Sequence, residues 1–126
     1  MFKKAAVLLT ALLLSTAASA DICATDFYGV ALRQSEDFIG TSDSLTGRLV
    51  RFIKSEDDNI TVTGWREGEC MGLATSVGLM VICARDTTAE IWNIEGLSGL
   101  VFWSKTSYHP NFVMNKALVG RLVTCT

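Results

Sequence analysis

The chain has 126 residues, with eleven basic and thirteen acidic side chains, a formal net charge of −2 at neutral pH and four cysteines. Mild acidity and scattered charges argue against a nucleic-acid-binding protein, which needs clustered Lys and Arg side chains. A chain of this length can bury one hydrophobic core, and no repeat, linker or low-complexity segment divides it.

Residues 1–20, MFKKAAVLLTALLLSTAASA, have the pattern of a secretory signal peptide, with two lysines before an apolar run and a small-x-small motif ending at Ala20. The run is shorter than the about 20 apolar residues of a transmembrane helix. We therefore predict cleavage before Asp21 and no stable membrane span afterwards. The mature chain, 21–126, is then a single small domain with nine basic and thirteen acidic side chains, a net charge of −4. Its expected location is the periplasm or outside the cell.

Beyond residue 20, short apolar and alternating segments separated by Gly, Asp and Ser turns predict β-strands. The clearest hairpin joins 47–55 to 59–67 through the turn EDDN. A second hairpin is predicted across MGLATSVGLMVI, residues 71–82. The segment 33–47 is expected to be mainly loop. The remaining strands, in chain order, are expected over 22–32 (a strand, with or without a turn of helix), 78–85, 89–95, 100–107 and 116–125.

Strands at spacings near ten residues predict an all-β fold, a small antiparallel meander closed into a β-barrel or folded as a sandwich. Either form hides the edges of the sheet from other chains. The single proline also fits, since central strands exclude it. A barrel would place the first and last strands side by side.

An even number of cysteines in a small exported domain predicts two disulfides. We favour Cys70–Cys83 across the 71–82 hairpin and Cys23–Cys125 between the two ends of the mature chain. The main alternative is Cys23–Cys70 with Cys83–Cys125. There is no C-x-x-C motif and only one histidine, so the cysteines predict neither a redox pair nor a metal site. No metal and no cofactor are expected.

The residues available for catalysis are few. His109 is the only side chain whose ordinary pKa suits proton transfer near neutral pH, and no G-x-S-x-G nucleophile motif is present. The acidic run at 56–58 lacks the ligand spacing of a calcium loop. The sequence therefore predicts a non-enzymatic protein, with a hydrolase that uses His109 as the remaining enzymatic hypothesis.

The segment SGLVFWSKTSYHPNF, residues 98–112, is the strongest candidate for a binding site. We expect a strand over 100–104 that runs into a loop over 105–112. Small exported β-domains commonly bind through loops carried on a rigid scaffold. The leading hypothesis is therefore a non-catalytic binding or inhibitory module, acting through the 104–112 loop on another protein or an envelope ligand. The candidate contact residues are Ser104, Lys105, Tyr108 and His109.

An alternative function is that of a structural or assembly protein of the bacterial envelope. In this reading Trp65, Trp92 and Trp103 form an exposed apolar surface for a partner. Neighbouring residues of a strand point to opposite faces, so only one of Phe102 and Trp103 is expected in the core.

The motif FWSK, followed by a polar segment and a closing strand that ends in cysteine, resembles the C-terminal part of the periplasmic and membrane-bound inhibitors of c-type lysozyme. The resemblance implies a small exported antiparallel β-barrel. It also implies that Ser104 and Lys105 enter the lysozyme cleft, where the lysine would meet the catalytic carboxylates. Thr106 stands where the family usually has glycine.

Overall fold

The computed structural model describes residues 21–45, 47–55, 57–64, 68–109 and 112–125. The predicted signal peptide and Trp65 lie outside these described residues.

Nine strands and one short 3-10 helix make up the described chain. Their order is β1 (Ile22–Arg33), η1 (Gln34–Glu36), β2 (Thr41–Leu45), β3 (Val50–Lys54), β4 (Asn59–Thr63), β5 (Gly68–Ala74), β6 (Gly78–Arg85), β7 (Thr88–Glu95), β8 (Leu100–His109) and β9 (Phe112–Val123). The strands expected over 78–85 and 89–95 are confirmed almost to the residue. The segment 33–47 is not mainly loop, because it contains η1 and β2.

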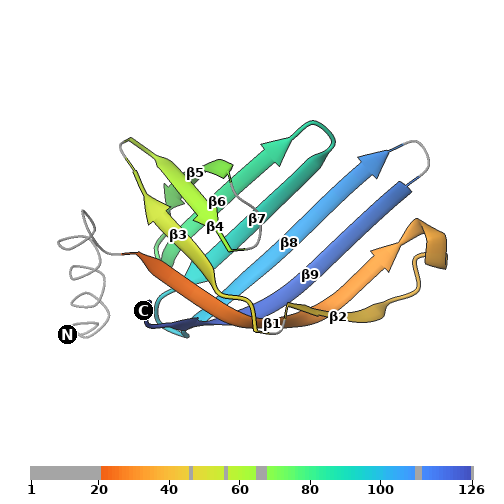
Figure 1. The fold of residues 1–126 in the computed structure, drawn as a ribbon, viewed down its shortest axis with the longest axis horizontal. Helices are drawn as coiled ribbons and strands as arrows, with labels where there is room; N and C mark the ends of the chain where they lie inside the picture. The colour runs from red at the N-terminus through yellow and green to blue at the C-terminus, as the bar shows by residue number, and fades with distance from the viewer. Residues whose placement is uncertain (1–20, 46, 56, 65–67, 110–111, 126) are drawn as a thin grey trace.

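The strands form a closed eight-strand antiparallel barrel, in which β2 and β3 occupy successive parts of one position beside β1 (Figure 1). From β3 to β9 each strand pairs with the next along the chain, and β9 closes the barrel by pairing with β1. The first part of β1 pairs with β3 and the second part with β2. The all-β prediction is confirmed, and the fold is the barrel and not the sandwich.

One end of the barrel, called the β8–β9 rim below, is where β8 meets β9, β6 meets β7, and β1 passes through η1 to β2. In Figure 1 these three connections lie toward the right of the view. The opposite end holds the Cys23–Cys125 disulfide and the β7–β8 connection.

Two stacked tryptophans fill the middle of the barrel. The rings of Trp92 and Trp103 lie 5.0 Å apart and nearly parallel, and both side chains are fully buried. Phe27 and Phe52 meet Trp92 edge-on, at 5.6 and 5.3 Å. The prediction that Trp92 and Trp103 form a partner surface is therefore wrong. They occupy the alternate positions of β7 and β8 that face inward, whereas Phe102 faces outward, so one residue of the Phe102–Trp103 pair is in the core, as expected.

A β-bulge in β1 turns Phe27 into the core. The register of β1 against β9 shifts between Thr25 and Tyr28, and Asp26 takes a left-handed backbone conformation with φ 59°. Because the bulge inserts an extra residue, Ala24 and Phe27 are both fully buried although they are three positions apart. Asp26 then faces outward, where its carboxylate accepts a hydrogen bond from the Arg121 guanidinium at 2.9 Å.

The strands β1 and β9 approach each other closely at Gly29. A Cβ atom at this position would lie 2.0 Å from the carbonyl oxygen of Ala117 on β9. Glycine is therefore required where the barrel closes.

The two disulfides are the favoured pair, Cys23–Cys125 and Cys70–Cys83, with Cα–Cα distances of 5.4 and 4.6 Å. Structural disulfides of this kind indicate an oxidising environment outside the cytoplasm. In the described part of the chain, no helix has the length and apolar character that crossing a bilayer requires.

Candidate functional sites

The predicted loop over 105–112 is wrong. β8 continues to His109, and the register pairs Lys105 with Lys116 and His109 with Phe112, so the strands run together almost to the end of the hairpin. The reason is that the inward positions of β8 become polar beyond Trp103. The alternation of apolar and polar residues, which reveals a strand in the sequence, disappears there although the strand continues.

As a consequence, the four candidate contact residues do not form one site. Ser104 and Tyr108 point outward and are exposed, whereas Lys105 points into the barrel beside Glu90 of β7. His109 is the last residue of β8. The segment therefore contributes to two different surfaces, one inside the barrel and one on its wall.

The inner surface is a cluster of acidic and basic side chains at the β8–β9 rim. The register places Glu90, Lys105 and Lys116 in one transverse row across β7, β8 and β9. The row continues to Ala31 of β1 and Thr41 of β2. Asp43 joins the row through its ion pair with Lys116, and Arg33 through its ion pair with Asp43. We call these five acidic and basic residues the charged cluster: Arg33, Asp43, Glu90, Lys105 and Lys116.

The charged cluster lies directly above the apolar centre of the barrel. Trp92, Trp103 and Leu118 form the next transverse row, and all three are buried. In small barrels the interior is filled by such layers of side chains. The floor of the cluster is thus dry, and an ionised group next to it interacts more strongly with a neighbouring charge than it would in water.

Asp43 is the central carboxylate on one side of the cluster. Its Oδ2 lies 2.7 Å from the Lys116 ammonium and 3.3 Å from the Arg33 guanidinium, and its Oδ1 accepts a hydrogen bond from the Ser44 N–H. Burial raises the pKa of Asp43. The hydrogen bonds from Lys116 and Ser44 and the charges of Lys116 and Arg33 outweigh that effect, and they hold the pKa below its ordinary value of 3.8.

On the other side of the cluster the charges are held more loosely. The Lys105 ammonium lies 4.0 Å from Glu90 Oε2, while the Glu90 side chain is only 1% exposed. In the next row toward the rim, the hydroxyls of Thr88 and Ser107 lie 3.2 Å apart and bond to each other. The cluster therefore joins a tight ion pair at Asp43 to a looser one at Glu90.

Asp43→Asn is expected to lower the free energy of unfolding by about 1–3 kcal/mol at pH 7, because two cations lose their shared carboxylate. The folded-state pKa of Asp43 lies below its unfolded value, so its stabilisation is present above pH 3.8 and is lost as the pH falls through the folded-state pKa. Urea unfolding of both proteins at pH 7 and pH 3 measures this, and the difference should shrink at pH 3. Asp86→Asn, in the exposed β6–β7 turn, is the control. Equal stabilities at pH 7 would contradict the prediction.

The second surface is the outer wall of the barrel between β7 and β2. Its side chains alternate with the buried ones. From the row of Asn93 and Phe102 to the rim they are uncharged, whereas the next row toward the opposite end carries Glu95 and the exposed Asp26–Arg121 ion pair. We call the uncharged part of this wall the uncharged face, and it consists of Tyr28, Val30, Leu32, Ser42, Ser44, Ala89, Ile91, Asn93, Phe102, Ser104, Thr106, Tyr108, Val113, Asn115, Ala117 and Val119.

Large apolar side chains are exposed on the uncharged face. Tyr28 is 67% exposed, Tyr108 60% and Val30 48%. Phe102, Val119 and Tyr28 follow one another in a transverse row across β8, β9 and β1. The face is therefore a continuous, partly aromatic surface that crosses the closure of the barrel.

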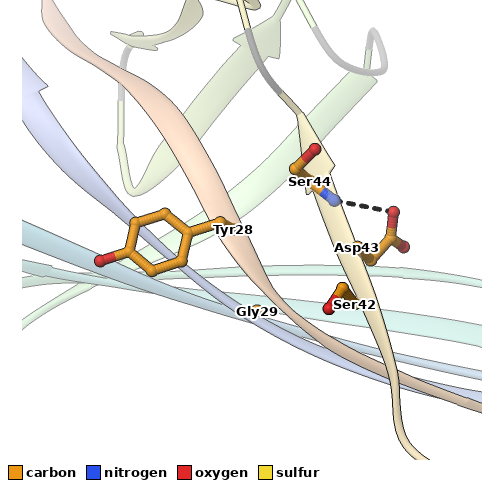
Figure 2. Close-up of a pocket in the computed structure, with 5 residues that line it drawn as sticks. All are labelled: Tyr28, Gly29, Ser42, Asp43 and Ser44. Atoms are coloured by element: carbon orange, nitrogen blue, oxygen red, sulfur yellow. Dashed lines mark hydrogen bonds between the residues drawn. The ribbon is translucent and has the colours of Figure 1, made fainter.

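Two open hollows lie on this wall. One, of 360 Å³, is lined by Tyr28, Gly29 and residues 42–44 of β2. Figure 2 shows Tyr28 projecting from β1 and the Asp43 carboxylate accepting the Ser44 N–H on the neighbouring strand. The other, of 220 Å³, lies over β7, β8 and β9 and includes Phe102 and Ser104.

Of the residues that form these surfaces, the sequence identified only Ser104, Lys105 and Tyr108. A signal for the charged cluster exists in AEIWNIE, where Glu90 shares the inward alternation of Trp92. In the described part of the chain, no three His, Cys, Asp or Glu side chains are grouped so as to hold a metal ion.

No protein-family model matches the chain, and no curated protein or solved structure matches it either. Proposals about its function therefore depend on its own residues.

Proposed function

We propose that this protein is an exported, non-catalytic binding protein of the cell envelope, and that it contacts another protein through the uncharged face. The observation that carries the proposal is the absence of charge from that face combined with its exposed aromatic residues. The centres of protein–protein interfaces are poor in charged residues and rich in Tyr and Phe.

The shape of the face supports a protein partner over a small ligand. Small-molecule sites are enclosed clefts that bury most of the ligand, whereas the hollows beside Tyr28 and Phe102 are open and lie on a wall of strands. Tyr28 stands between them as a projecting ring, which suits insertion into a partner's surface. The proposed contact surface is therefore a strand face instead of the predicted 104–112 loop, and it retains Ser104 and Tyr108.

Site-specific photo-crosslinking tests this proposal. A photoreactive phenylalanine analogue at position 102 is expected to capture one defined protein from an envelope extract, and the same analogue at Asn59, exposed on β4, is expected not to. Phe102→Asp and Tyr28→Asp, each combined with the analogue at Ser104, should reduce the adduct at least tenfold. An adduct of equal yield from position 59 would overturn the proposal. So would an adduct whose mass is that of two copies of this chain.

Inhibition of c-type lysozyme is the second candidate function, favoured by the small antiparallel β-barrel that the FWSK resemblance implies. Lys105 would have to act from within the charged cluster, beside Glu90. Added protein at micromolar concentration is then expected to inhibit lysozyme, and Lys105→Ala to lose the effect. Unchanged lysozyme activity would remove this candidate.

A further inference from the structure

Two lysines lie directly opposite each other inside the barrel. Lys105 and Lys116 are cross-strand partners on β8 and β9, and their side chains are only 22% and 12% exposed. Like charges in directly opposite positions destabilise a sheet, and enclosing them adds a desolvation cost. Packing alone would be served better by apolar residues here, directly above the tryptophan layer.

The protein supplies few acceptors for these two ammonium groups. Each carries three N–H donors. Lys116 has the Asp43 carboxylate at 2.7 Å, but Asp43 also serves Arg33. The nearest carboxylate oxygen to Lys105 is 4.0 Å away, beyond hydrogen-bond distance, and Lys105 makes no hydrogen bond to the described residues. Several donors are therefore directed into the rim without a protein acceptor among the described residues.

The distribution of carboxylates around Lys105 and Lys116 also favours an additional anion at this place. The charged cluster contains three cations and two carboxylates. With Glu36 of η1, which contacts Arg33 at 3.6 Å and is 44% exposed, the carboxylates number three, but two of them, Asp43 and Glu36, contact Arg33. Among the described residues, Lys105 and Lys116 therefore have near them only Glu90, at 4.0 Å from Lys105, and Asp43, which Lys116 shares with Arg33. An anion between the two lysines would lie above an apolar floor, where its attraction to them is least weakened by water.

We infer that the charged cluster binds a small oxyanion, a carboxylate or a phosphate, between Lys105 and Lys116. Its oxygens accept hydrogen bonds from both ammonium groups, and it enters from the β8–β9 rim. The hydroxyls of Thr88 and Ser107, one row nearer the rim, supply further donors by turning away from each other. This site lies inside the barrel and does not depend on the uncharged face or on its partner.

Titration of the full mature protein with sodium phosphate and, separately, sodium acetate tests the inference, with sodium chloride holding the ionic strength constant. Tryptophan fluorescence is the readout, because Trp103 lies in the row beneath Lys105. We expect a saturable change with at least one oxyanion, and the arm that saturates identifies phosphate or carboxylate as the ligand class. Lys105→Met should weaken binding at least tenfold. Lys54→Met, an exposed lysine on β3, should leave it unchanged.

Two further variants separate binding from folding. Glu90→Gln removes the competing carboxylate and is expected to tighten oxyanion binding several-fold, whereas a purely structural role of Glu90 predicts no such gain. Lys105→Arg keeps the charge and should retain binding if Lys105→Met fails to fold. A response that rises linearly and equals that of chloride would overturn the inference. Equal affinities for the wild-type protein and a folded Lys105→Met variant would also overturn it.

Discussion

Trp92→Ala is expected to lower the free energy of unfolding by about 3–5 kcal/mol, the range for removing a large aromatic side chain from a packed core. The Trp92 side chain is fully buried, and its ring contacts Trp103, Phe27 and Phe52. The substitution would leave a cavity at the centre of the barrel. The strands around it are held by their hydrogen bonds to one another, so they cannot move inward to fill it. Since domains are stable by only about 5–15 kcal/mol, the variant should be close to unfolding at 37 °C.

Phe102→Ala is the matched control for Trp92→Ala. It also removes an aromatic ring, but Phe102 is 38% exposed on the uncharged face and pairs with Asn93 next to the Trp92–Trp103 pair. Urea unfolding followed by far-UV circular dichroism should show a loss of about 1 kcal/mol or less for this variant, as for most exposed positions. Comparable losses in the two variants would contradict the assigned core.

Replacing Cys23 and Cys125 together with alanine is expected to lower the free energy of unfolding by about 4–5 kcal/mol, because the bond closes a very long loop in the unfolded chain. The two cysteines are 102 positions apart. The Cys70–Cys83 pair, 13 positions apart, is the control, and its removal should cost about 3 kcal/mol on the same basis. Urea unfolding of both double variants gives the comparison. A larger loss for the hairpin pair would show that loop closure is not the dominant effect.

Much of the fold could be predicted, because the local residue pattern indicates several strands and the positions of the cysteines indicate which segments meet. The strands β6 and β7 have clear patterns between short turns. The favoured disulfides followed from two ideas that the structure confirms: a hairpin between Cys70 and Cys83, and a barrel that brings the chain ends together. In contrast, β2 reads TSDSL and contains a single large apolar residue. Its pairing with β1, which no local signal reveals, makes it a strand.

The charged cluster could not be predicted for a different reason. Glu90, Lys105, Lys116 and Asp43 come from four strands, and only the register of those strands brings them into contact. Along the chain each looks like a solvent-facing charge. The polar residues at the end of β8 led to the prediction of a loop. The inward-facing Lys105 and the outward-facing hydroxyls of Ser104 and Thr106 are all polar, so the alternation of apolar and polar residues that indicates a strand is absent there.

The seam between β1 and β9 has a consequence for the order of events in biogenesis. The register joins Cys23 to Val123 and Arg33 to Met114, so the first strand finds its long partner only when the last strand has been made. Contacts so distant in sequence slow folding, and until they form β1 has no complete ladder. The pairings from β3 to β8 join strands that are neighbours along the chain, so they can form first, and closure between β1 and β9 is expected to be the last step. Barrel closure and the Cys23–Cys125 bond would follow together in the oxidising compartment.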